Sequence, residues 1–108
     1  MTHMIKKEYM REPLRLASML LAANIPFEIG EMCNGLIICY PCMGEGCVSD
    51  AICHDHSYGR HMGLLEIMGC LTDEEAEYDC VVGSLSAENV FERWHKHWLE
   101  THAEEEGE

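Results

Sequence analysis

The stretch PFEIGEMCNGLIICYP, residues 26–41, decides the fold class. Its residues 27–30, FEIG, alternate between an apolar and a non-apolar position, which is the period-two pattern of a half-buried β-strand. The triplet CNG at 33–35 is typical of a tight turn, and the apolar run GLIICYP at 35–41 follows it as a second strand. The sequence therefore predicts a β-hairpin that starts an antiparallel sheet.

Further strand-like segments follow this hairpin. VSDAICH at 48–54 is a candidate third strand, and DCVVGSL at 79–85 is a candidate fifth strand. Between them, GLLEIMGCL at 63–71 fits either a fourth strand or a short helix, because a short apolar run does not distinguish the two periods. LTDEEAEYD at 71–79 is an acidic connection in which Thr72 is positioned to open one helical turn.

Helical patterns flank the strands on both sides. REPLRLASMLLAAN at 11–24 has Pro13 in its first turn, where proline suits a helix. The apolar stripe of this helix is predicted to be Leu14, Ala17, Leu20 and Leu21. A second helix is predicted after Ser86, a good N-cap. Its core residues are predicted to be Val90, Phe91, Trp94 and Trp98. We therefore expect an α+β fold, with an antiparallel sheet of four to five strands flanked by an N-terminal and a C-terminal helix and stapled by a structural metal.

The domain organisation follows from length and composition. No linker or repeat divides the 108 residues, so one domain is expected over 1–108, with frayed ends at 1–8 and 103–108. No apolar run reaches the length of about 18 residues that spans a membrane, and the first residues do not form a secretory signal. We therefore expect a cytoplasmic protein. In that reducing compartment, seven cysteines favour metal binding, redox chemistry or buried thiols over disulfides.

The charge of the chain restricts its partners. The formal net charge is -13, from 7 Lys and Arg against 20 Asp and Glu. Residues 16–92 hold one cation, Arg60, against thirteen acidic residues. Such a surface repels nucleic-acid phosphates and attracts basic proteins, including those that hold nucleic acid. We expect a basic protein partner, with no direct binding to nucleic acid or membranes.

The stretch ICYPCMGEGCVSDAICHDH at 38–56 concentrates four cysteines and two histidines in nineteen residues. The cysteine spacing is Cys-x2-Cys-x4-Cys-x5-Cys, and zinc takes four such ligands in a tetrahedron at about 2.0–2.3 Å. The predicted ligands of a structural Zn2+ are Cys39, Cys42, Cys47 and Cys53, with His54 or His56 as alternatives.

The segment CYPCMGEGCVSDAIC at 39–53 resembles a zinc knuckle, whose pattern is Cys-x2-Cys-x4-His-x4-Cys. Cys47 replaces the histidine, the last interval is one residue longer, and the segment has no Lys or Arg. The resemblance therefore implies a metal site without the nucleic-acid binding of knuckles. A local shell also requires that 48–53 is not a full strand, since full extension would place Cys53 about 17–20 Å from Cys47.

A five-stranded meander would offer two other groupings of ligands at the ends of the sheet. One end would hold Cys42, Cys47, Cys70 and Cys80. The opposite end would hold Cys33, His54, His56 and His61. The sequence leaves these alternatives open.

No catalytic motif accompanies the thiols, so the chain is predicted not to be an enzyme. A thioredoxin-like role for CYPC at 39–42 is an alternative, because Cys-x2-Cys thiols can be activated. That motif normally opens a helix after a strand, whereas Gly44 and Gly46 follow here. A thiol redox enzyme is therefore the third hypothesis for function.

Three segments spread over much of the chain resemble small proteins encoded by bacteriophages and mobile elements. They are IPFEIGEMCNGLIICYP, SYGRHMGLLEIMG and VVGSLSAENVFERWHKHW. Acidic proteins of this kind include anti-CRISPR inhibitors, some of which contain zinc. The resemblance implies a protein that acts in the cytoplasm of a bacterial host cell. It also implies an inhibitor of a type II CRISPR effector nuclease, which holds nucleic acid in a positively charged channel.

In that hypothesis, an acidic surface docks on a basic lobe of the nuclease and blocks DNA binding. The predicted contact residues are Asp73, Glu74, Glu75, Glu77, Glu28, Glu31 and Glu66. The alternative is a small metal-stapled adaptor with an unrelated partner.

Overall fold

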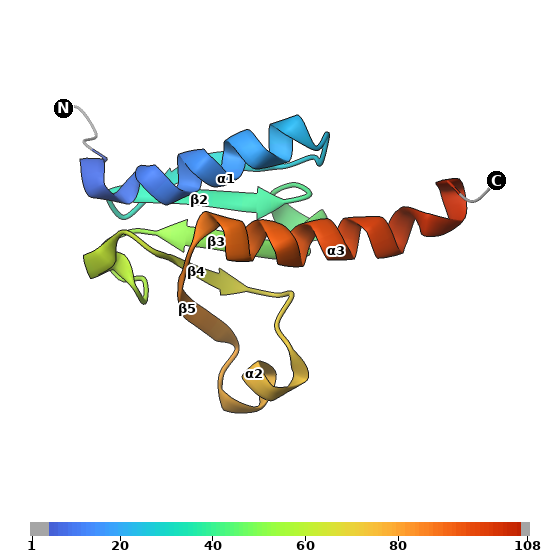
Figure 1. Ribbon diagram of the computed structural model, residues 1–108. Coiled ribbons are helices and arrows are strands. Elements are labelled where there is room, and N and C mark those ends of the chain that lie inside the picture. The colour runs from blue at the N-terminus through green and yellow to red at the C-terminus, as the bar shows by residue number, and fades with distance from the viewer. Residues whose placement is uncertain (1–4, 107–108) are drawn as a thin grey trace.

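The computed structural model describes residues 5–106, with side chains up to residue 102, and has two layers, helices and one sheet (Figure 1). In chain order the elements are η1 (Lys7–Tyr9), α1 (Arg11–Ala22), β1 (Glu28–Met32), β2 (Gly35–Tyr40), η2 (Gly44–Gly46), β3 (Ser49–Cys53), η3 (Arg60–Met62), β4 (Leu65–Met68), α2 (Asp73–Tyr78), β5 (Val81–Leu85) and α3 (Ala87–Glu106). The predicted α+β fold, with an antiparallel sheet and a helix at each end, is confirmed.

The five strands form one antiparallel meander in the order β1-β2-β3-β4-β5. The ambiguous segment 63–71 contains the strand β4, which pairs with β3 and β5. In β4, the buried residues Leu65 and Ile67 alternate with Glu66 and Met68, as a strand covered on one face requires. The acidic connection after it contains the short helix α2 that the sequence predicted at Thr72.

The turn between β1 and β2 consists of Cys33 and Asn34, and Met32 pairs with Gly35 across it. Both turn residues have positive φ, 47° and 63°, as a two-residue type I′ hairpin turn requires. A Cβ at position 35 would lie 1.9 Å from the carbonyl oxygen of Cys53, so glycine permits the close approach to β3. The predicted hairpin and its turn are therefore confirmed.

One face of the sheet lies under α1 and α3, and we call it the covered face. Ile38, Ala51 and Ile67 are register neighbours on this face and are fully buried. Tyr40 stacks on Trp94 of α3, with 5.3 Å between the ring centroids. The hydrophobic core therefore lies between the covered face and the two long helices.

The set of residues that the helices bury differs in part from the one that the sequence predicted. On α1, Leu16 and Leu20 are fully buried, whereas Leu14 and Leu21 are exposed. Because α1 packs against both the sheet and α3, its buried side is centred on Leu16 rather than on the predicted stripe. On α3, Val90 and Trp94 are fully buried, and Phe91 and Trp98 pack against the core while partly exposed.

The side chain of Glu12 joins the two long helices. This buried carboxylate accepts a hydrogen bond from the Ala87 N–H at the start of α3, at 2.8 Å, and forms ion pairs with Arg11 and Arg15. Burial alone would raise the pKa of Glu12, but the hydrogen bonds from Ala87, Arg11 and Arg15 outweigh burial and lower it. The carboxylate therefore fixes the first turn of α3 to the first turn of α1.

The predicted frayed ends fall partly outside the described residues, at 1–4 and 107–108. Within the described part, Lys7–Tyr9 forms a 3-10 turn and α3 continues to Glu106. Over the same described part, no helix has both the length and the apolar character needed to cross a membrane.

Candidate functional site

The four cysteines of the predicted local zinc shell lie on different faces of the sheet. β3 is a regular strand that includes Cys53, which pairs with Leu36 and points into the core. Cys39 pairs with Asp50 and lies on the opposite face, because successive side chains of a strand alternate between faces. Residues 49–53 thus form the full strand that a local shell excludes, and the structure does not bring the four thiols together.

Two thiols of this stretch, those of Cys39 and Cys47, do meet. They are close enough to influence each other electrostatically, and the Cys47 thiol donates to the Ser49 carbonyl oxygen at 3.4 Å. Burial, followed by electrostatic repulsion from Cys47 and Asp50, raises the pKa of Cys39 to about 11. Such a thiol stays protonated at neutral pH, unlike the low-pKa cysteines of redox enzymes.

The two groupings at the ends of the sheet are not assembled either. Cys70 borders a cavity beside α3 and Cys80 is exposed, while Cys33 is exposed in the β1–β2 turn. His54 is buried, which lowers its pKa, and its Nδ1 accepts a hydrogen bond from the His56 N–H at 3.0 Å. Among the described residues, no group of three or more His, Cys, Asp or Glu is arranged to hold a metal. Zinc binding stays a prediction of the sequence.

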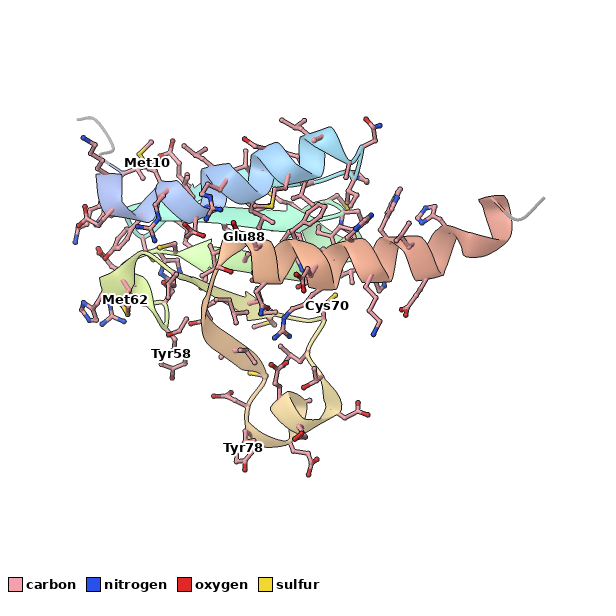
Figure 2. All side chains as sticks on the ribbon, in the orientation of Figure 1. Met10, Tyr58, Met62, Cys70, Tyr78 and Glu88 are labelled. Carbon is pink, nitrogen blue, oxygen red and sulfur yellow. The ribbon has the colours of Figure 1, made fainter. Side chains whose placement is uncertain are left out.

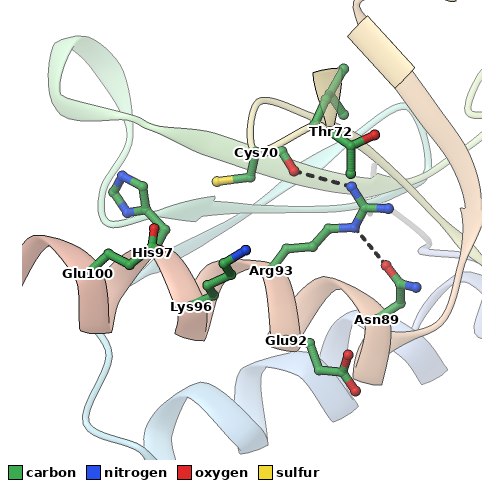
Figure 3. A pocket seen from close by; sticks show the side chains of 9 residues that line it. Cys70, Thr72, Asn89, Glu92, Arg93, Lys96, His97 and Glu100 are labelled. Carbon is green, nitrogen blue, oxygen red and sulfur yellow. Dashed lines mark hydrogen bonds between the residues drawn. The ribbon is translucent and has the colours of Figure 1, made fainter. Parts of the chain in front are cut away.

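A cavity of about 450 Å³ opens between α3 and the connection from β4 to α2 (Figure 3). It is lined by Cys70, Leu71, Thr72, Asn89, Glu92, Arg93, Lys96, His97 and Glu100. The Arg93 guanidinium donates to the Cys70 carbonyl oxygen at 3.2 Å and to Asn89 Oδ1 at 2.7 Å. The sequence analysis did not predict this cavity. The one feature of the sequence that pointed to it was the run of polar residues at helical spacing along α3.

His97, one of the residues that line this cavity, contacts a buried tyrosine behind it. The Tyr40 hydroxyl lies 2.6 Å from His97 Nδ1. Burial and the nearby Cys70 raise the pKa of Tyr40 to about 12, and burial also raises the pKa of Cys70. Both groups are therefore neutral at pH 7, and the contact with His97 satisfies a buried hydroxyl rather than activating a nucleophile.

The acidic segment 71–80 forms a projection beyond the ends of β4 and β5, at the bottom of Figure 1. A capping box starts α2, because Thr72 Oγ1 accepts from the Glu75 N–H and the Glu75 carboxylate accepts from the Thr72 N–H. Arg93 of α3 donates to both carboxylate oxygens of Glu75, at 2.7 Å and 2.8 Å. We call residues 71–80 the α2 projection.

These bonds change the role of one predicted contact residue. The Arg93 hydrogen bonds, followed by that from the Thr72 backbone, lower the pKa of Glu75 to about 2. Glu75 therefore anchors the projection to α3, and its carboxylate already pairs with a cation of the same chain. Asp73, Glu74 and Glu77 are exposed, and no ion pair among the described side chains involves them. Tyr78 is 93% exposed and points away from the body of the molecule (Figure 2).

The other three predicted contact residues divide between the two faces of the sheet. Glu28 and Glu66 lie on the face turned away from the helices, which we call the open face. Their carboxylates accept hydrogen bonds from the Met43 N–H at 2.7 Å and the Tyr58 N–H at 2.8 Å. Glu31 lies on the side of α1, where it borders a groove with Leu14. The open face consists of Glu28, Gly30, Met32, Ile37, Cys39, Asp50, Ile52, Glu66, Met68 and Val81.

In comparisons with known proteins, no protein family, no curated protein and no solved structure matches this chain. Its function is therefore proposed from its own charge and geometry.

Proposed function

We propose that this protein is an acidic inhibitor that binds a basic, nucleic-acid-handling protein, and specifically a type II CRISPR effector nuclease. The observation that carries the proposal is the α2 projection. It presents Asp73, Glu74, Glu77 and the 93% exposed Tyr78 at the end of the molecule. Acidic side chains steer a protein toward basic surfaces, and exposed aromatic side chains supply contact area on arrival.

The projection suits binding because it is held in place before any partner arrives. The two Arg93–Glu75 hydrogen bonds and the capping box at Thr72 fix α2 relative to α3. A pre-organised element loses less conformational entropy on association than a disordered acidic loop. The acidic residues are therefore presented as a shaped surface rather than as a flexible tail.

The mechanism of inhibition follows from competition for positive charge. A type II nuclease holds nucleic acid in a positively charged channel. A protein with a net charge of -13 is repelled by DNA itself, so it acts on the nuclease rather than on the substrate. Occupation of basic residues by the projection blocks DNA binding, and loss of cleavage follows from loss of binding.

The experiment measures association with a purified type II nuclease bound to its guide RNA, over a series of salt concentrations. The variant Glu74→Gln/Glu77→Gln removes two exposed charges of the projection and leaves the Glu75 anchor intact. The matched control is Glu8→Gln/Glu45→Gln, which removes two exposed charges elsewhere. We expect the first variant to slow association by about threefold to tenfold at low salt and to flatten its salt dependence. The control should retain the wild-type rate.

Target-DNA binding by the nuclease is measured in parallel. The inhibitor should prevent DNA binding rather than the cleavage step alone. Absence of a complex with the nuclease would remove this partner. Equal slowing by both double variants would show that net charge, not the projection, governs association.

A further inference from the structure

The open face of the sheet is more apolar than the solvent-facing side of an antiparallel sheet usually is. Such faces normally carry polar side chains. Here Ile37 of β2 and Ile52 of β3 are cross-strand neighbours at its centre, and Met32 and Met68 are exposed toward its edges. Met43 from the β2–β3 loop also lies over it, since its Cε is 2.8 Å from where a Cβ at Gly30 would be. Exposed apolar patches mark interaction sites, and methionine side chains adapt to a partner's shape.

A half-buried carboxylate, that of Asp50, lies within this apolar surface. Asp50 stands between Cys39 on β2 and Met68 on β4 in the register of the sheet. It is half-buried, and among the described residues no hydrogen bond or ion pair reaches its carboxylate. Burial, followed by repulsion from Glu66, raises the pKa of Asp50. Folding therefore keeps a poorly solvated negative charge at a position where an outside cation could pair with it.

The charges of the open face select the kind of partner. Its ionisable residues of the Asp, Glu, Lys and Arg types are Glu28, Asp50 and Glu66, all acidic. A second copy of the chain would place like carboxylates against each other, which costs free energy at neutral pH. A basic partner would pair with the same carboxylates, so charge complementarity excludes self-association and favours a cationic surface.

We propose that the open face is the docking surface for a basic amphipathic helix of the partner protein, with its apolar side on Ile37, Ile52 and Met68 and an Arg or Lys paired with Asp50. This inference rests on the proposed function, in which the partner is a basic protein. The covered face shows how this sheet accommodates helices, because α1 and α3 pack on its apolar rows. A docked helix would add a third layer, an arrangement common in α/β proteins. The α2 projection then steers the partner, and the open face holds it.

The first arm of the test separates binding from stability at Asp50. Asp50→Asn keeps the size of the side chain and removes its charge. We expect it to lower the affinity for the nuclease–guide complex by about tenfold while the midpoint of urea unfolding stays the same or rises. Unchanged affinity for the nuclease–guide complex, whatever the unfolding midpoint, would overturn the proposal.

The second arm uses two exposed apolar residues of nearly equal exposure, Met68 at 49% on the open face and Leu99 at 48% on α3. Met68→Lys should weaken binding by about tenfold or more, whereas Leu99→Lys should change it by less than about twofold. Equal effects of the two variants would overturn the open face as the docking site.

A third arm distinguishes failure of the surface from failure of the proposed partner. The probe is an 18-residue helical peptide of leucine and lysine, with the lysines on one side, titrated into 15N-labelled protein. We expect the largest amide shifts at Ile37, Asp50, Ile52 and Met68. Shifts confined to the α2 projection would overturn the open-face proposal and leave the proposed function intact. Peptide binding at the open face without nuclease binding would support the surface and remove the nuclease as partner.

Discussion

The two faces of the sheet show how similar strands serve two purposes. On the covered face, Ile38 and Ile67 are sealed under α1 and α3. On the open face, Ile37 and Ile52 occupy the alternate positions of β2 and β3, yet no helix of the described chain covers them. The covered face stabilises the fold, whereas burial of the open face would be completed only by a partner. Stability and binding are thereby assigned to opposite sides of one sheet.

The same division is visible in two carboxylates. Glu12 is buried with three donor residues around it, and its pKa is lowered. Asp50 is half-buried, its carboxylate has no hydrogen-bond partner in the described chain, and its pKa is raised. A buried charge with donors connects parts of a fold, while one without donors is a cost that a binding partner can offset.

The largest expected effect comes from truncating the core of the covered face. Trp94→Ala should lower the free energy of unfolding by about 3–5 kcal/mol, because it removes a fully buried aromatic side chain and its stacking on Tyr40. Met68→Ala on the open face should lower it by less than about 1 kcal/mol, since this side chain is already in contact with water. Urea unfolding followed by circular dichroism measures both. A loss at Met68 as large as that at Trp94 would mean that the open face also belongs to the core.

An intermediate effect is expected from neutralising the two carboxylates. Glu12→Gln should cost about 1–3 kcal/mol, because it weakens charged hydrogen bonds to Ala87, Arg11 and Arg15. Because folding lowers the pKa of Glu12, its contribution is present above the unfolded-state pKa and is lost as the pH falls through the folded-state pKa. Asp50→Asn should behave oppositely: its raised pKa makes the charge unfavourable at pH 7, so the difference from wild type should shrink as the pH falls.

Urea midpoints of wild type and both variants, taken from pH 7 to pH 3, measure these trends. Equal destabilisation by Glu12→Gln and Asp50→Asn at pH 7 would break the contrast between the two faces.

The smallest effect on global stability is expected at the α2 projection. Glu75→Gln removes a charge held by Arg93 on a partly exposed element, so the unfolding midpoint should change little. The projection itself should loosen, and limited proteolysis beside Tyr78 should become faster. In wild type, the same loosening should set in as the pH falls below the usual range of a glutamate toward about 2, the pKa of Glu75 in the fold. Glu77→Gln, which removes an exposed charge that forms no ion pair with the described residues, is the matched control and should leave the cleavage rate unchanged.

The fold class could be predicted because period-two and period-3.6 patterns are local. The hairpin turn near CNG was also predictable, since asparagine and glycine favour tight turns and Asn34 has one of the two positive φ values of this turn. The assignment of β4 as a strand could not be predicted, because four alternating residues within an apolar run fit a strand and a helix equally well. Only the pairing with β3 and β5 identifies this segment as a strand.

The site was harder to predict because it depends on register and on distant contacts. Whether Cys39 and Cys53 share a face depends on the pairing of β2 with β3, which the long loop between them does not fix. No local sequence pattern connects Arg93 with Glu75 either. That ion pair nevertheless distinguishes Glu75 from the exposed acidic residues of the projection. The acidic composition was evident from the sequence. Which acidic residues lie on the α2 projection, which lie on the open face and which, like Glu12, connect α1 with α3 could be seen only in the three-dimensional structure.

The hydrogen bond between Glu12 and Ala87 spans 75 positions of the chain, and this has a consequence for synthesis. The meander lets each strand pair with its predecessor as it leaves the ribosome, so the sheet can form early through contacts close in sequence. The covered face nevertheless lacks Trp94 until α3 has been translated. A nascent chain that stalls before α3 would expose apolar rows on both faces of its sheet, the condition in which partly folded chains aggregate or recruit chaperones.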